Sequence, residues 1–146
     1  MNEMLPVVII EMLSDAQKVF TENGIEYFIV GAIARDIRLA KIPGHASPRM
    51  TNDVDFAVMV PDETAFDTIK EALVATGRFT TDENNPLKLI YRERFEIDLL
   101  PFGEIENDMR EISLQNPKVF TMDVPGFREV HSSLEDIKIG EESFRA

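Results

Sequence analysis

Ten residues, TNDVDFAVMV from Thr51 to Val60, place two aspartates at the start of an apolar run. The β-branched and aromatic residues of Val54 to Val60 are typical of a strand. Because side chains alternate along a strand, Asp53 and Asp55 share one face and the alternate apolar residues share the other. The chain must therefore fold around a strand that has one apolar face and two carboxylates at the start of its second face.

A second strand candidate, Phe95 to Leu100, carries Glu96 and Asp98 on one face in the same way. Two carboxylates two residues apart on a strand have Cα atoms about 6.5–7 Å apart, and two-metal sites hold their ions roughly 3.5–4 Å apart. Oxygen ligands suit Mg²⁺ or Mn²⁺ and not zinc. We predict that Asp53, Asp55 and Asp98 meet in one partly open cleft. The alternative is that Asp53 caps its strand and Asp55 is an exposed edge residue.

A change from strand to helix is predicted at Gly31. The residues from Glu26 to Val30 are typical of a buried strand, and those from Ile33 to Ala40 of a helix. Backbone N–H groups at the start of such a helix can bind a phosphate that approaches past small side chains. Gly31 can equally be a plain turn between the two elements, because glycine is common where the chain changes direction.

The rest of the chain supports one domain, 1–146, of an α/β (α+β) class with a mixed sheet flanked by helices. The other predicted elements are a helix over Leu5–Asn23, a loop over Lys41–Asn52 that borders the cleft, a helix from the N-cap Asp62 to Gly77 with Phe66, Ile69, Ala72 and Leu73 buried, a strand over Lys88–Arg92 and β-like structure from Lys118.

Composition limits the function classes. The chain has a formal net charge of −12 and no cysteine, which excludes disulfides, thiolate metal sites and a cysteine nucleophile. Phosphate-tracking proteins are usually basic, so this surface alone does not favour a nucleic-acid partner. The first residues lack a positive n-region, and no apolar run has membrane-spanning length. We therefore expect a soluble, cytoplasmic protein with no membrane partner.

Three motifs in order, VGAIARD, RMTNDVDFAV and FEIDLLPFG, resemble the polymerase-beta-like nucleotidyltransferase superfamily. Within it, they look most like the AbiEii-type bacterial nucleotidyltransferases, which include toxins of toxin–antitoxin systems. The resemblance covers Ile25 to Gly103 and implies a nucleotidyltransferase-like core. It implies that Asp53 and Asp55 bind metal, and that Asp98 ligates the catalytic ion and helps to deprotonate the acceptor. Glu96 has no role in the resemblance, and we expect it to be solvated.

The resemblance also implies nucleotide-binding roles for Gly31 and Ala32 in the turn around the phosphates, for Arg35 in the first helical turn, and for Arg49 and Thr51 ahead of the acid pair. Ala32 stands where a glycine or serine is usual, so a hydroxyl contact to phosphate is lost while the backbone donors remain. Arg35 can instead pair with Asp36 or Asp55, and Thr51 can serve only to orient the loop.

The activity so implied is Mg²⁺- or Mn²⁺-dependent transfer of an NMP from an NTP to a hydroxyl on RNA, a protein side chain or a small molecule. Relatives usually continue into a helical C-terminal region, whereas this sequence ends at Ala146. We therefore expect a short core, or a cleft completed by a homodimer or a partner chain. Two alternatives are a catalytically silent nucleotide- or metal-binding regulatory module and a plain structural domain with surface acids.

Overall fold

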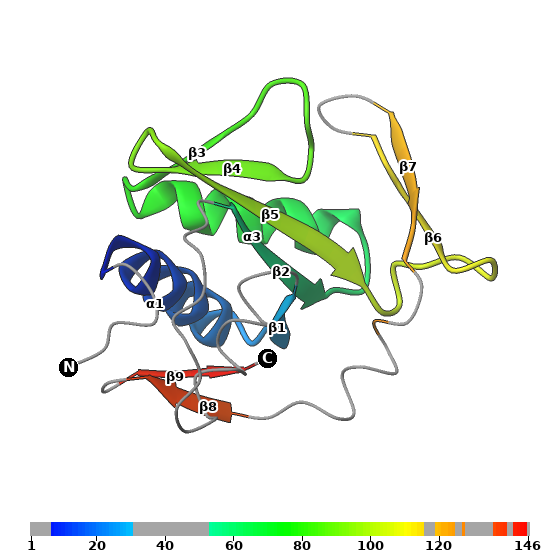
Figure 1. The fold of residues 1–146 in the computed structure, drawn as a ribbon. Helices are drawn as coiled ribbons and strands as arrows, with labels where there is room; N and C mark the ends of the chain where they lie inside the picture. Colours follow the sequence, from blue (N-terminus) through cyan, green and yellow to red (C-terminus); the bar gives the residue numbers. More distant parts are fainter. Residues whose placement is uncertain are drawn as a thin grey trace.

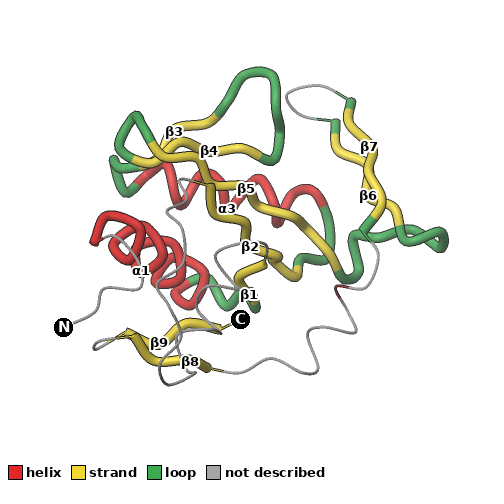
Figure 2. The backbone as a smooth tube through the Cα atoms, in the orientation of Figure 1, coloured by secondary structure: helices red, strands yellow, loops and turns green. Residues whose placement is uncertain are grey.

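A five-stranded mixed sheet forms the centre of the molecule, in the order β1-β2-β5-β4-β3 (Figures 1 and 2). The computed structural model describes residues 7–30, 53–115, 119–124, 127, 136–139 and 142–145. The strands of this sheet are β1 (Tyr27–Val30), β2 (Asp53–Met59), β3 (Phe79–Thr81), β4 (Lys88–Tyr91) and β5 (Phe95–Phe102). β2 and β5 are parallel, and the other neighbours are antiparallel. The mixed α+β class expected from the sequence is confirmed.

Helix α1 (Val7–Glu22) lies on one face of this sheet. Its apolar residues recur at helical spacing, so they form one stripe that faces the core; the buried ones are Ile9, Met12, Leu13, Ala16, Val19 and Phe20. The ring of Phe20 packs edge-on against Phe56 of β2, with centroids 5.2 Å apart. The helix ends before Gly24, which adopts φ 69°, as the Asn23–Gly24 pair predicts.

Helix α3 (Glu63–Ala75) begins and ends where the sequence predicts. The Asp62 carboxylate caps it by accepting a hydrogen bond of 2.9 Å from the Ala65 backbone N–H. Gly77 follows the last turn with φ 83°, a conformation that glycine adopts without steric cost. Phe66, Ile69 and Leu73 are buried as expected, whereas Ala72 is only partly buried against the core. Lys70 is also buried, which was not expected. Figure 1 shows α3 behind β4 and β5.

The two faces of the sheet differ in chemistry. The face that Phe20 contacts is continuously apolar and buried; it includes Ile29, Val54, Phe56, Val58, Leu89, Tyr91, Ile97 and Leu99. We call it the covered face. Because side chains alternate along β2 and β5, the opposite face carries Asp55, Glu96 and Asp98 at one end. We call it the acidic face. Its other end carries the buried apolar residues Phe28, Ala57 and Phe102. The alternation expected from the sequence therefore holds in both strands.

Two hairpins follow the sheet. The first pairs β6 (Glu111–Leu114) with β7 (Phe120–Asp123), and the second pairs β8 (Asp136–Ile139) with β9 (Glu142–Arg145). The β6–β7 hairpin stands to one side of the sheet in Figure 1. The last three strands agree with the β-like structure predicted from Lys118. β3 and β6 were not predicted, because runs of three and four residues give little periodicity.

A buried carboxylate fixes the chain where it leaves β5. The Glu106 side chain is 0% exposed and forms an ion pair with Arg110. Arg110 Nε donates a hydrogen bond of 2.9 Å to Glu106 Oε1. Its other oxygen accepts a hydrogen bond of 2.8 Å from the Gly103 N–H. Gly103 has φ 98°, and a Cβ there would lie 2.8 Å from Met59 Cγ. The end of β5 is thereby tied beside the end of β2.

Asp15 joins three elements that are distant in sequence. Its Oδ2 accepts a hydrogen bond of 2.6 Å from the Tyr91 hydroxyl of β4 and one of 2.8 Å from Arg78 Nε, just ahead of β3. Tyr91 is fully buried. Burial, followed by the hydrogen bond to Asp15, raises the pKa of Tyr91 above its ordinary value of 10.0. α1 is thereby anchored to the β3–β4 edge of the sheet.

We predict that Asp15→Ala lowers the free energy of unfolding by about 1–3 kcal/mol, because it leaves a buried hydroxyl and a guanidinium without their acceptor. Urea denaturation checks this, with the exposed Glu22→Ala on the same helix as a control that stays within about 0.5 kcal/mol of wild type. An Asp15→Ala protein as stable as the control would show that the contact contributes nothing.

The raised pKa of Tyr91 gives this contact a pH dependence. The raised value means that the stabilisation is complete below the unfolded value of about 10 and is lost as pH rises through the folded value. The difference in unfolding free energy between wild type and Tyr91→Phe should therefore shrink above about pH 10. A difference that is constant from pH 8 to 11 in urea titrations would contradict this assignment.

Candidate functional site

Four residues form a straight row across the acidic face, one on each of four neighbouring strands. Val30 of β1 pairs with Asp55 of β2, Asp55 pairs with Asp98 of β5, and Asp98 pairs with Lys88 of β4. Directly paired residues on adjacent strands project to the same face, and neighbouring strands lie about 4.8 Å apart. The backbone therefore places the Asp55 and Asp98 side chains next to each other on the acidic face.

The surroundings of the pair are partly desolvated. Asp55 and Asp98 are half-buried, while their chain neighbours Val54, Phe56 and Ile97 are buried on the covered face. One carboxylate oxygen of Asp98, Oδ1, is buried from solvent. Strand backbone held by a packed core cannot easily rotate to separate the two acids. The pair is therefore preorganised by the fold before any ligand arrives.

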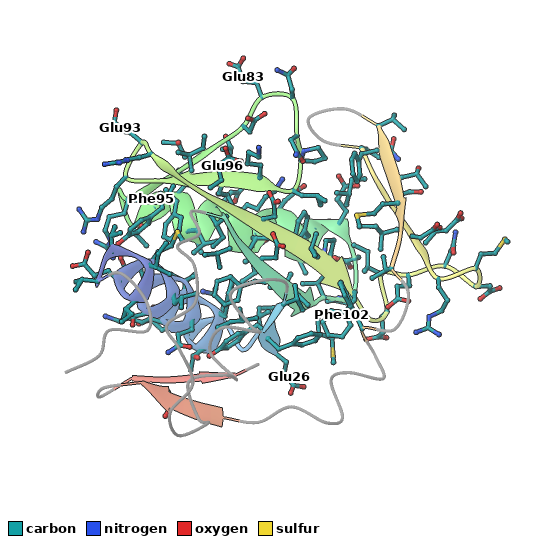
Figure 3. The ribbon with its side chains drawn as sticks, viewed as in Figure 1. Glu26, Glu83, Glu93, Phe95, Glu96 and Phe102 are labelled. Atoms are coloured by element: carbon teal, nitrogen blue, oxygen red, sulfur yellow. The ribbon has the colours of Figure 1, made fainter. Side chains whose placement is uncertain are left out.

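A second pair of charged residues lies beside these acids. Lys88 Nζ is 2.6 Å from Glu96 Oε1, and the two side chains are 25% and 48% exposed. The hydrogen bond to Glu96 raises the pKa of Lys88 above its usual value, and the charges of Glu96, Asp98 and Asp82 act in the same direction. Glu96 is exposed, as expected of a solvated residue, and its carboxylate also pairs with Lys88. Figure 3 shows Glu96 near the start of β5, with Phe102 at its far end.

The structure describes only part of the remaining predicted site residues. Asp53 begins β2 and pairs in backbone register with Glu96, while its side chain lies outside the described part of the structure. The predicted nucleotide-binding residues also lie outside the described residues; they are Gly31, Ala32, Arg35, Arg49 and Thr51. The same holds for the predicted helix Ile33–Ala40 and the loop Lys41–Asn52. Gly31 nevertheless follows directly in the chain from Val30, the backbone partner of Asp55.

The donor set of the acid pair suits a hard cation. Mg²⁺ is usually held by one or two carboxylates together with water and substrate phosphates, and an all-protein cage is uncommon. Asp55 and Asp98 supply two such carboxylates on adjacent strands. Within the described ranges no group of three or more His, Cys, Asp or Glu side chains is arranged to hold a metal ion. The described residues therefore contain no closed structural metal site.

A surface pocket of ≈ 390 Å³ lies elsewhere, beside α1. It is lined by Ile10, Glu11, Ser14, Asp15, Arg78 and Arg92. Its charges already balance, since Arg78 is ion-paired with Asp15 at 2.8 Å. We therefore place the candidate site at the acid pair, where two like charges are adjacent, and not at this pocket.

Scans of protein-family models, curated proteins and solved structures find no match to this chain. None of the described helices combines the length and apolar character needed to cross a membrane. The function must therefore be inferred from the residues and their arrangement. Lys88 is the member of the row that the sequence did not reveal, because its position opposite Asp98 depends on the register of two strands.

We predict that Asp55→Asn stabilises the metal-free protein, because it removes one of two like charges directly opposite each other on adjacent strands. The expected gain is about 0.2–1 kcal/mol, the range for cross-strand charge effects. Urea unfolding in EDTA measures it, with Asp108→Asn in an exposed loop as a control for the loss of one negative charge. A loss of stability in Asp55→Asn would mean that Asp55 is a structural acid satisfied by its surroundings.

Proposed function

We propose that this chain is a nucleotidyltransferase that depends on Mg²⁺ or Mn²⁺ and transfers an NMP from an NTP to a hydroxyl acceptor. The observation that carries the proposal is the in-register pair Asp55–Asp98, beside the strand end that leads into Gly31. The resemblance of the three sequence motifs to AbiEii-type nucleotidyltransferases supports the same reaction. Half-buried carboxylates at adjacent positions of a central sheet are costly unless they are paired or hold a cation.

The reaction is a substitution at phosphorus. The acceptor hydroxyl oxygen forms a bond to the α-phosphorus of the NTP, and the bond from that phosphorus to the bridging oxygen breaks. Pyrophosphate leaves with the electron pair of that bond, and the hydroxyl proton passes to the Asp98 carboxylate and then to solvent. A bound divalent cation supplies charge neutralisation for the triphosphate and the leaving group.

The contribution of this chain is position and charge. Asp55 and Asp98 would hold the cation from two neighbouring strands whose register is fixed by the core. Asp53 begins the same strand as Asp55 and is proposed as a third ligand. Gly31 and Ala32 are proposed to bind the phosphates through backbone N–H groups, with Arg35, Arg49 and Thr51 near them. Positioning of this kind lowers the barrier without a covalent intermediate.

The charge of the chain bears on the acceptor. With 27 acidic and 15 basic residues, the surface attracts divalent cations but repels free polyanions. An RNA acceptor would therefore need basic charge from a partner chain of different composition. A protein side chain or a small hydroxylated molecule would not need this help.

The direct test is transfer of label from an NTP. The protein is incubated with Mg²⁺ and each α-³²P-labelled NTP in a cell extract, and RNA, protein and small-molecule fractions are separated. We expect one fraction to become labelled with one preferred NTP. Asp55→Asn and Asp98→Asn should reduce labelling by at least about 100-fold, since both remove a proposed cation ligand. Asp108→Asn is the matched control and should label as wild type does.

Thermal unfolding separates binding from turnover. If the acid pair binds the cation only in the folded state, millimolar Mg²⁺ should raise the melting temperature of wild type and not that of Asp55→Asn. Mg²⁺ stabilisation without any labelled product would instead favour the catalytically silent regulatory module. Equal shifts in wild type and Asp55→Asn, together with no labelling, would overturn both.

A further inference from the structure

Lys88 lies at one end of the row that also contains Val30, Asp55 and Asp98. It is the first residue of β4 and lies directly opposite Asp98, which in turn lies opposite Asp55. Its ammonium lies 2.6 Å from Oε1 of Glu96, which is on the same face of β5 as Asp98. Lys88 thus places a positive charge beside Glu96 and opposite Asp98 on the acidic face.

The simplest role for such a residue is a cross-strand ion pair. Pairs of this kind on exposed sheet surfaces contribute little to stability. However, the Lys88 side chain is only 25% exposed, and Asp98, which lies directly opposite it, is one of the residues proposed to hold a cation. An ammonium ion near a cation site opposes the entry of a metal ion by charge repulsion, and it attracts the phosphates that arrive with the metal.

We propose that Lys88 is a resident counter-ion of the acidic face and that it binds the phosphates of the incoming nucleotide when a divalent cation takes over charge neutralisation. This inference depends on the proposed function above. Lysine suits the role because its charge is compact and its four-carbon stem lets Nζ move between nearby partners. Lysine is also a common phosphate ligand, acting as a point charge.

The two parts of the proposal predict effects of opposite sign for one substitution. Lys88→Met removes one positive charge from beside the acids, so Mg²⁺ alone should bind more tightly. The same substitution removes a phosphate contact, so a nucleotide in the presence of saturating Mg²⁺ should bind more weakly. A cross-strand pair with only a structural role would change folding stability and would not produce this pair of opposite shifts.

Isothermal titration calorimetry of the purified full chain measures both constants. For Lys88→Met, we expect the Kd for Mg²⁺ to fall roughly two- to fivefold, the factor expected for loss of one partly exposed ion pair. The Kd for a non-hydrolysable ATP analogue in saturating Mg²⁺ should rise about tenfold, as expected for loss of one hydrogen bond to a charged group. Lys88→Arg keeps the charge and should stay near wild type in both.

Lys18→Met is the matched control, since Lys18 is exposed on α1. This variant loses the same charge at a position away from the acidic face. Circular dichroism shows whether each variant is folded before titration, and Lys88→Gln replaces Lys88→Met if the latter is not. If the folded Lys88 variants have the same Kd values for Mg²⁺ and for the analogue as wild type, the proposed role of Lys88 is wrong and the proposed function still stands. A wild-type protein that binds neither Mg²⁺ nor the analogue would overturn both.

Discussion

The parallel pairing of β2 with β5 is the constraint on which the rest of the structure depends. Val54 and Phe56 on one strand and Ile97 and Leu99 on the other are buried on the covered face. A slip of the register by one residue would move these side chains to the wrong face, which the hydrophobic effect strongly opposes. The same register sets Asp55 opposite Asp98. The core therefore positions the acids.

This arrangement has an electrostatic cost in the metal-free protein. Two carboxylates on adjacent strands repel each other, and partial burial removes some of the water that would screen them. The Lys88–Glu96 ion pair at 2.6 Å places positive charge at the edge of the cluster and offsets part of this repulsion.

Much of the framework could be predicted from the sequence because it depends on local patterns. The period of apolar residues predicted helix α1, and Asp62 and Gly77 predicted the limits of helix α3. The alternation of apolar and acidic residues predicted the two faces of β2 and β5. Contacts between distant segments could not be predicted in this way. The position of Lys88 opposite Asp98 depends on strand order, and the hydrogen bond from Tyr91 to Asp15 joins residues 76 positions apart. β3 could not be predicted either, because its three residues are too few to show a periodic pattern.

The central claim is that Asp55 and Asp98 together bind a divalent cation. Titration of ¹⁵N-labelled protein with substoichiometric Mn²⁺ tests it most directly, because this paramagnetic ion broadens the NMR signals of nearby amides. We predict that the amide signals of Asp55, Asp98 and Lys88 broaden first, while those of Glu22 and Ser113 persist, and that excess Mg²⁺ reverses the effect. Equal broadening at exposed acids across the surface, or none at Asp55 and Asp98, would contradict the account.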